Sequence, residues 1–433
     1  MRGAGGLSSP NDAALARALA VARRRLLPLV ILVYVVAWLD RVNIGFAALQ
    51  MNRDLGFSAA VYGLGAGLFF VSYGLLEIPS NLILARVGAR RWLARILVSW
   101  GLISAATLWV RTPGQFYAMR CLLGAAEAGC LPGVIYFLGS WFPAQERGRV
   151  MALLMLAIPV ASIIGGPLAG ALLGLNGLGG LAGWQWLLLL EGLPAVVLGI
   201  IVLRRLPDTP QSAPWLDAEA RAALVASLQR PESEAGIPGH ASWTVVLTDS
   251  LVWRLALAQM LGNVGSFGLQ FWMPQILKSV SGAGDFAIGA IAALPFIPAA
   301  IVMVLIGRHS DRSGERALHA AVPCLAGAAG FALAAFVQST AAALLAMTIA
   351  ACGIYGRHGP SWAVPTTYLS GRAAAAGIAL INSVGAVGGF VGPYAVGLFK
   401  GAGQGYAGAF LFLGAALALA AAIFATLPRR SLR

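Results

Sequence analysis

Long apolar runs separated by short polar loops dominate this chain. A membrane-spanning helix needs about 20 apolar residues. Twelve runs are long enough, and they lie near residues 26–49, 61–84, 92–110, 114–138, 150–174, 184–203, 252–276, 286–306, 318–338, 341–364, 374–399 and 405–427. Glycine and proline occur inside many of them, as membrane helices tolerate. The pattern predicts an all-α integral membrane protein with twelve transmembrane helices.

The composition supports lipid as the solvent of these helices. Of the 433 residues 59% are hydrophobic and 11% are charged, whereas a soluble domain carries about 25% charged residues. The net charge of +14 does not indicate a nucleic-acid partner, because the positive residues cluster in short loops between apolar runs. The four cysteines all lie within apolar runs and are not spaced as metal ligands, so we expect them to pack between helices, with no metal bound.

The arginines and lysines predict the orientation. With a cytoplasmic N-terminus, 23 of the 30 fall in cytoplasmic segments and four fall outside. Positive residues accumulate on the cytoplasmic side of membrane proteins, so we expect both termini to be cytoplasmic and the number of spans to be even. The other three, Arg41, Arg120 and Arg357, lie within apolar runs.

An internal repeat divides the chain into two halves. Arg86 and Arg312, in loops that follow the second and eighth runs, are 226 residues apart. The Gly-Pro pairs at 166–167 and 392–393 differ by the same 226 residues. Two six-helix halves in the same orientation are therefore predicted, which is a plan of secondary transporters whose substrate site lies between the halves near mid-membrane.

Polar segments mark the boundaries of these halves. The predicted organisation is a cytoplasmic tail (1–25), a first half (26–205), a cytoplasmic linker (206–250), a second half (251–427) and a short tail (428–433). The linker is rich in proline and acidic residues, and a short surface helix is expected over 215–229.

Two pairs of charges within the spans are the strongest functional candidates. Asp40 and Arg41 are adjacent in the first run, and Arg120 and Glu127 lie in the fourth. A charge in such surroundings is costly and is a functional-site candidate by default. Asp40 shares a helix face with Asn43, while Arg41 points about 100° away. Arg120 and Glu127 are two helical turns apart on one face.

These residue types suit the transport of an anion with a proton. A carboxylate in a desolvated cavity can take up and release a proton near neutral pH. A guanidinium keeps its charge and binds a carboxylate through two parallel hydrogen bonds. The alternative is that the charges form permanent ion pairs that lock helices together.

Several motifs resemble those of the major facilitator superfamily, and within it of the anion:cation symporter family. The superfamily loop signature is matched by residues 307–316 (GRHSDRSGER), although the first-half copy has Ala85 where an acidic residue usually stands. The family is matched by residues 39–47 (LDRVNIGFA), 77–81 (EIPSN), 120–129 (RCLLGAAEAG), 141–147 (WFPAQER), 191–194 (EGLP) and 377–382 (GIALIN). The nearest branch resembles bacterial transporters of sugar acids, tartrate and aromatic acids.

The resemblance implies a role for each candidate residue. It places proton coupling on Asp40 and Glu127. The implied substrate-binding residues are Arg41, Asn43, Tyr73, Arg120, Ser361, Trp362 and Asn382. Tyr73 and Trp362 could instead be packing aromatics, and Asn382 could also be a core residue. The implied conformational latch consists of the loop charges Arg86, Arg90, Asp311, Arg312 and Arg316. Glu77 and Glu191 are expected to pair with loop arginines.

One departure from the family concerns Arg357 and His358 in the tenth run, where related sequences usually carry small residues. If both face the cavity, they favour a more strongly anionic substrate such as a dicarboxylate. If they lie at a rim, they are merely solvated.

The sequence thus predicts a proton-coupled symporter that imports a small organic anion across the bacterial inner membrane and acts as a monomer, with protons as the coupling ion and no cofactor. A proton-coupled antiporter that exports a drug or metabolite is the alternative. A sensor is disfavoured because the linker is too short and polar for a soluble domain. An enzyme is disfavoured because the sequence has no His-rich cluster, Cys–His pair or phosphate loop.

Overall fold

The computed structural model describes residues 10–229, 247–368 and 371–427. The first half contains α1 (Pro10–Asp54), α2 (Ala59–Val87), α3 (Ala89–Ala106), η1 (Thr107–Trp109), α4 (Pro113–Glu127), α5 (Cys130–Gly139), α6 (Ala144–Met155), α7 (Ala157–Leu173), η2 (Leu178–Gly180) and α8 (Gly183–Arg205). The linker contributes η3 (Pro210–Ser212) and α9 (Ala218–Gln229). The second half contains α11 (Ser250–Ser281), α12 (Asp285–Ala293), α13 (Phe296–Ser313), α14 (Ala317–Ala334), α15 (Thr340–Gly356), α16 (His358–Tyr368), α17 (Gly371–Gly401) and α18 (Ala407–Ala425).

The predicted all-helical membrane fold is confirmed. Within the described residues, eleven helices are long and apolar enough to cross a membrane, some of them built from two consecutive segments such as α4 and α5. The predicted seventh run, 252–276, lies in the long helix α11, which does not reach the same hydropathy. Its polar side chains, among them the buried Gln259 and Gln270, face the protein interior rather than lipid. The count of twelve spans and the cytoplasmic termini remain predictions.

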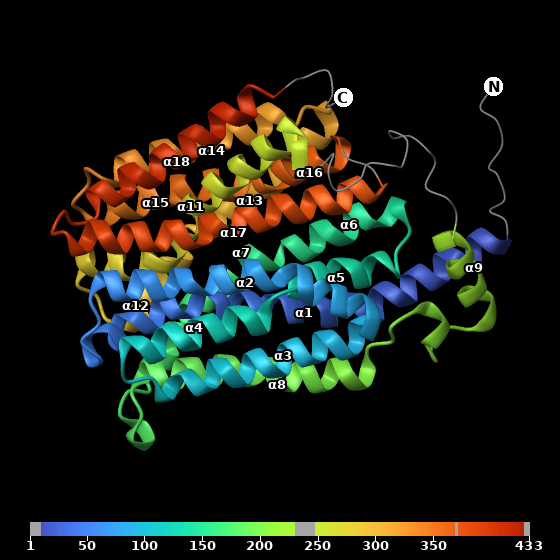
Figure 1. Ribbon diagram of the computed structural model, residues 1–433, viewed down its shortest axis with the longest axis horizontal. Coiled ribbons are helices and arrows are strands. Elements are labelled where there is room, and N and C mark those ends of the chain that lie inside the picture. The colour runs from blue at the N-terminus through green and yellow to red at the C-terminus, as the bar shows by residue number, and fades with distance from the viewer. Residues whose placement is uncertain (1–9, 230–246, 369–370, 428–433) are drawn as a thin grey trace.

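The first helix of the chain is longer than predicted and contacts the linker. Helix α1 begins at Pro10, well before the expected start at residue 26. The helix expected over 215–229 is confirmed as α9, which packs against the beginning of α1 (Figure 1). An ion pair of 2.7 Å between Arg17 and Glu219 joins the two helices at the surface.

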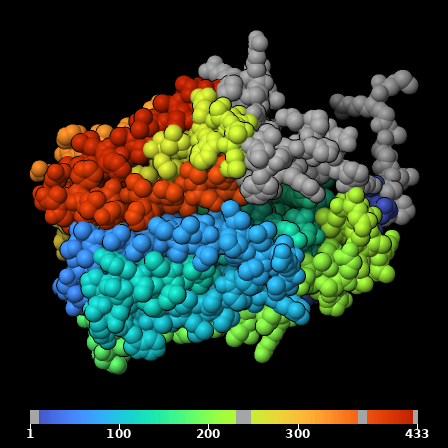
Figure 2. Space-filling model, in the orientation of Figure 1, coloured from blue at the N-terminus to red at the C-terminus, as the bar shows by residue number. Residues whose placement is uncertain are grey.

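The two halves lie side by side and meet along two seams. In Figures 1 and 2 the blue helix α2 runs along the orange-red helix α17 at the boundary between the halves. The second seam joins α7 to α12. One continuous hydrophobic cluster extends across both halves, from Ala18 on α1 to Leu417 on α18.

Glycines allow the backbones to approach closely at both seams. A Cβ atom on Gly63 would lie 2.8 Å from the carbonyl oxygen of Pro393, and one on Gly289 would lie 2.2 Å from that of Gly166. Gly63 and Gly289 are separated by the same 226 residues as the sequence repeats. Equivalent glycines of the two repeats therefore make equivalent backbone contacts, one at each seam.

Polar bonds join the halves at the same end of the molecule. Tyr62 donates to the carbonyl oxygen of Phe271 at 2.8 Å, and Gln50 donates to Asp285 at 2.8 Å. Asn52 on α1 donates to Gln275 on α11 at 3.3 Å. Together with the glycine contacts, these bonds close this end of the interface between the halves.

We expect Gly289→Ala to disfavour this closed end, because the new Cβ would meet the backbone oxygen of Gly166 at 2.2 Å. Overpacking costs about 1–3 kcal/mol, or roughly five- to 150-fold in the closing equilibrium. A cysteine placed at Asn52 should then react faster with an impermeant maleimide. Gly114→Ala is the matched control, since its Cβ would meet nothing within 4 Å. Equal labelling rates in the two variants would contradict the expectation.

Candidate functional site

Among the charges within the first-half spans, Arg41 on α1 forms an ion pair with Glu127, the last residue of α4. The side chain of Glu127 is 1% exposed and that of Arg41 is 11% exposed. Glu127 uses one carboxylate oxygen for this bond, and its Oε2 atom has no hydrogen-bond partner among the described residues. Arg41 therefore pairs with the acid of another helix rather than with its sequence neighbour Asp40.

A break in the fourth span positions Glu127. The sequence predicts one helix over 114–138, but the structure divides it into α4 and α5 at Ala128 and Gly129. Gly129 has φ +86°, a left-handed conformation that favours glycine. The hydroxyl of Ser80 on α2 donates to the carbonyl oxygen of Ala128 at 2.6 Å and so satisfies one of the backbone groups freed at the break. Glu127 consequently stands at a helix end rather than on a continuous helix face.

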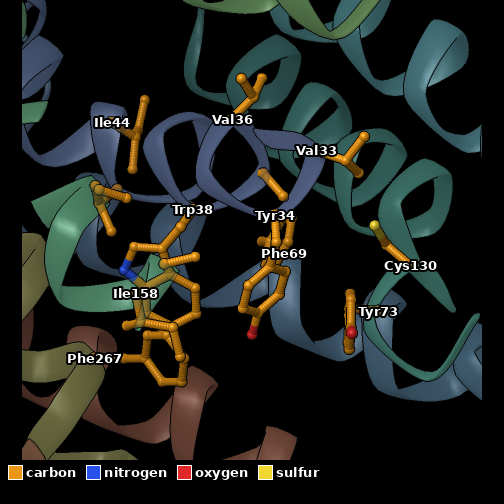
Figure 3. Close-up of a cluster of buried hydrophobic side chains, with 14 of the residues drawn as sticks. Val33, Tyr34, Val36, Trp38, Ile44, Phe69, Tyr73, Cys130, Ile158 and Phe267 are labelled. Atoms are coloured by element: carbon orange, nitrogen blue, oxygen red, sulfur yellow. The ribbon is translucent and has the colours of Figure 1, made fainter. Parts of the chain in front are cut away.

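Three aromatic rings surround the guanidinium of Arg41. Its Cζ atom lies 5.4 Å from the ring centroids of Trp38 and Phe69 and 5.1 Å from that of Tyr73. Phe69 and Tyr73 are one turn apart on α2 and stack with centroids 5.8 Å apart. Figure 3 shows them alongside Tyr34 and Trp38 of α1. Cation–π contacts of this kind stabilise a desolvated guanidinium.

Arg120 contacts the same ring. Its Cζ atom is 5.0 Å from the centroid of Phe69, and its side chain is buried. Its hydrogen bonds are long, at 3.4 Å to the carbonyl oxygen of Gly65 and 3.5 Å to that of Ala66. Among the described residues Arg120 forms no ion pair. Phe69 thus contacts two guanidinium groups, and among the described residues only that of Arg41 is neutralised by an acid.

Asp40 occupies a separate polar core in the first half. It is fully buried and accepts hydrogen bonds from Trp100 at 2.7 Å, from Asn43 at 3.1 Å and from Ser104. The bond from Asn43 confirms that these two residues share a helix face. Asp40 therefore points towards α3, while Arg41 points towards α2 and α4.

The two further glutamates pair with no loop arginine among the described residues. Glu77 is buried on α2 and accepts a hydrogen bond of 2.5 Å from Asn382 on α17. Glu191 is buried on α8 near Asp40 and Asn43. Helix packing carries both carboxylates into the interior, and Glu77 is part of the contact between the halves.

The remaining second-half candidates have local partners. The hydroxyl of Ser361 donates to the carbonyl oxygen of His358 at 3.1 Å within α16. Trp362 is partly buried and packs against the hydrophobic cluster of the second half that includes Val364 and Ile381. Of these candidates, only Asn382 bonds directly to the first half in this conformation.

Arg357 does not lie at a solvated rim, because it is fully buried. It stands between α15 and α16, and its side chain donates to two amide oxygens, those of Gln259 at 3.0 Å and Asn263 at 3.3 Å. The neighbouring His358 is partly exposed, donates from Nδ1 to the carbonyl oxygen of Ile354 at 2.9 Å and stacks on Tyr355.

The loop charges proposed as a latch bond within their own half. Arg90 lies 3.6 Å from Asp208, at the end of α8, and its backbone N–H donates to the same carboxylate at 2.8 Å. Arg316 pairs with Asp311 across the turn between α13 and α14. Arg86 is exposed. No described ion pair of these residues crosses between the halves, and their latch role stays a prediction.

Two cavities lie outside this group of charges. One of about 20 Å³ lies between the halves and is lined by Val42, Phe46, Ser162, Gln270, Met273, Pro274, Ala292 and Phe296. A larger one of about 450 Å³ opens on the surface where α13 ends and α14 begins. It is lined by Leu305, Ile306, Arg308, His309, Arg312 and His319. Neither cavity is lined by Arg41, Arg120 or Glu127, so we place the candidate site on the charges and not on the larger cavity.

Comparison with known proteins decides the family. The model of the Major Facilitator Superfamily matches residues 30–393. The chain belongs to this superfamily. It is accordingly a membrane transporter and not an enzyme, and it is a multi-pass protein of the bacterial inner membrane. The resemblance stated from the sequence motifs is confirmed.

Two bacterial relatives and one solved structure are similar over most of the chain. A protein of Agrobacterium vitis named "Putative tartrate transporter" is 47% identical over 94% of this chain and 90% of its own length. A "Quinolone resistance transporter" of Acinetobacter baumannii is 42% identical over 87% of both chains. The inward-facing, occupied structure of a bacterial homologue of the human lysosomal transporter Spinster has a TM-score of 0.74 and 18% identity. It covers 93% of this chain and 96% of that one, and it shows the superfamily fold.

Sequence reasoning missed the aromatic residues that hold the guanidinium groups. Phe69 contacts both Arg41 and Arg120, and Trp38 contacts Arg41. A signal was present, because Trp38 is three residues before Arg41, and Phe69 is one turn before Tyr73. Aromatic residues at such spacing are also common in packed helices, so the spacing alone does not identify the site.

Proposed function

We propose that this member of the superfamily is a secondary active symporter that takes up a small organic anion, such as a sugar acid or a mono- or dicarboxylate, together with protons. The observation that carries the proposal is the buried ion pair between Arg41 and Glu127 beside the unpaired Arg120. The relative named as a tartrate transporter, similar over 94% of this chain, supports an anionic substrate.

The coupling follows from two groups that share one guanidinium. While Glu127 is ionised, it neutralises Arg41. When Glu127 takes up a proton, the guanidinium becomes free to bind a carboxylate of the substrate through two parallel hydrogen bonds. Proton binding and anion binding therefore favour each other, and the coupling is reciprocal.

Arg120 supplies a second positive charge for the same anion. It contacts Phe69, as Arg41 does, and among the described residues it has only long bonds to backbone carbonyls. A buried guanidinium without a counter-ion is costly, and a substrate carboxylate would supply the missing charge. We propose that Arg120 and Arg41 together attract the anion and that the protein works as a monomer.

Uptake by the purified protein in proteoliposomes tests this function. An inward proton gradient should drive accumulation of labelled tartrate above its external concentration, and a protonophore should remove that accumulation. Tartrate that only equilibrates across the membrane, with or without the gradient, would contradict proton coupling.

The second candidate function is export of a drug or metabolite, and the relative named as a quinolone resistance transporter supports it. A proton-coupled antiporter for drugs should bind cationic or aromatic compounds in place of sugar acids. Competition between a cationic dye and tartrate for the purified protein separates the two functions. Arg41 and Arg120 favour the anion, because two neighbouring guanidinium groups repel a cation.

A further inference from the structure

The second half contains one buried charge without an opposite charge. Arg357 is fully buried and bonds only to the neutral side chains of Gln259 and Asn263, both on α11. Its Nε atom has no hydrogen-bond partner in the part of the chain that the structure describes. No aspartate or glutamate pairs with it among the described residues, although a buried guanidinium normally has an acid within reach.

The amide groups orient Arg357 without cancelling its charge. Asn263 is itself fixed by a hydrogen bond of 3.0 Å from its Nδ2 to the carbonyl oxygen of Gly385 on α17. Gly262 leaves the space that the guanidinium fills, since a Cβ atom there would lie 2.3 Å from the Cζ of Arg357. Three helices therefore contribute to holding this charge in one place.

Arg357 lies one helical turn after Gly353, which is the position equivalent to Glu127 by the 226-residue offset. The fourth and tenth spans begin at the equivalent N-caps Thr112 and Ser339. Each span is broken near its middle, after Glu127 in the first half and at Arg357 in the second. Each half therefore carries a charged residue near the break of this span, acidic in the first half and basic in the second.

Aromatic contacts lead from Arg41 across the interface to α11, the helix whose amides hold Arg357. Phe267 lies one turn after Asn263 on α11, and its ring is 6.3 Å from that of Trp38 on α1. Trp38 in turn contacts Arg41. Arg41 and Arg357 therefore belong to opposite sides of the same contact between the halves.

We propose that Arg357 binds a second carboxylate of the substrate and so selects dicarboxylates over monocarboxylates. This inference rests on the proposed function, because it assumes that the first carboxylate binds at Arg41 and Arg120. A dianion can bind the first half through one carboxylate and the second half through the other. A monoanion of the same length leaves Arg357 unpaired.

Binding of two matched acids by the full-length protein in detergent, without any gradient, tests the inference. Tartrate and threonate both have four carbons, and threonate has a hydroxymethyl group where tartrate has its second carboxylate. Wild-type protein should bind tartrate about 10- to 100-fold more tightly, as expected for a charge-assisted hydrogen-bonded pair. Titration calorimetry gives both dissociation constants.

The decisive variant is Gln259→Glu, which keeps the acceptor for Arg357 and adds an internal counter-ion. It should lower the affinity for tartrate about tenfold or more and change that for threonate less than about threefold. Gln275→Glu is the matched control, since it adds the same charge on α11 and keeps the bond from Asn52. Arg357→Gln should also remove the preference, and the Gln259→Glu result stands if that variant fails to fold.

The outcomes separate this inference from the proposed function. If Gln259→Glu leaves the ratio of the two affinities as in wild-type protein, Arg357 has only a structural role and the inference is wrong. If neither acid nor any other organic anion binds wild-type protein, the proposed function itself fails. Failure of proton coupling would not affect this result, because binding is measured without a gradient.

Discussion

Replacing Glu127 with glutamine will abolish proton-driven accumulation of the substrate while leaving exchange of substrate across the membrane. Glutamine has the size of glutamate but cannot take up or release a proton, so Arg41 is permanently without its acidic partner. Wild-type protein should concentrate tartrate by up to about tenfold per coupled proton for each unit of pH gradient. The variant should reach only the external concentration, as measured by radiolabel uptake and by counterflow in proteoliposomes.

The matched control for this variant is Glu146→Gln. Glu146 also pairs with an arginine, Arg23 at 2.8 Å, but it lies in the first turn of α6 and is partly exposed. Accumulation by this control should equal that of wild-type protein. If Glu127→Gln still accumulates tartrate against its gradient, the coupling assigned to Glu127 is wrong.

Arg41→Lys will weaken substrate binding by about tenfold or more, although the charge is kept. An ammonium cannot form the two parallel hydrogen bonds of a guanidinium, and it stacks less well on aromatic rings. Arg41 is held among Trp38, Phe69 and Tyr73, so this geometry is lost together with the bidentate contact. Arg41→Gln should lose more, about 30-fold or above, because truncating one partner of a buried pair costs about 2–5 kcal/mol.

Calorimetric titration with tartrate measures these losses. Arg53→Lys is the control on the same helix, because Arg53 is exposed and pairs only with its neighbour Asp54. Its affinity should match that of wild-type protein. An unchanged affinity of Arg41→Lys would show that Arg41 acts as a general positive charge and does not grip the substrate carboxylate.

Asp40 and Glu127 differ in ways that bear on their predicted common role. Asp40 accepts bonds from three donors and faces α3, whereas Glu127 has one ion pair and one free oxygen. A carboxylate held by three donors is stabilised as an anion. We therefore expect Glu127 to be the group whose proton is exchanged with the substrate, and proton coupling by Asp40 stays a prediction.

The sequence by itself determined the fold class, the repeat and the family. Apolar runs of about 20 residues can be satisfied only by spanning helices, and the 226-residue offset is visible from glycines and loop charges alone. It also identified the charged candidates, because a charge in an apolar run has few purely structural explanations. Even the linker helix α9 could be anticipated from its position in the one long polar segment.

Only the tertiary structure decided which charges are partners. A helical wheel gives the direction of a side chain but not the helix that it faces, so the pairing of Arg41 with Glu127 rather than Asp40 could not be read from spacing. The break at Gly129 changed the position of Glu127, and packing of α2 against α17 brought Glu77 to Asn382 instead of to a loop arginine. Arg357 was equally ambiguous, because its burial depends on the space left by Gly262 and on amides nearly one hundred positions earlier in the chain. Contacts between distant segments are set by how complete helices pack, and local sequence carries little of that information.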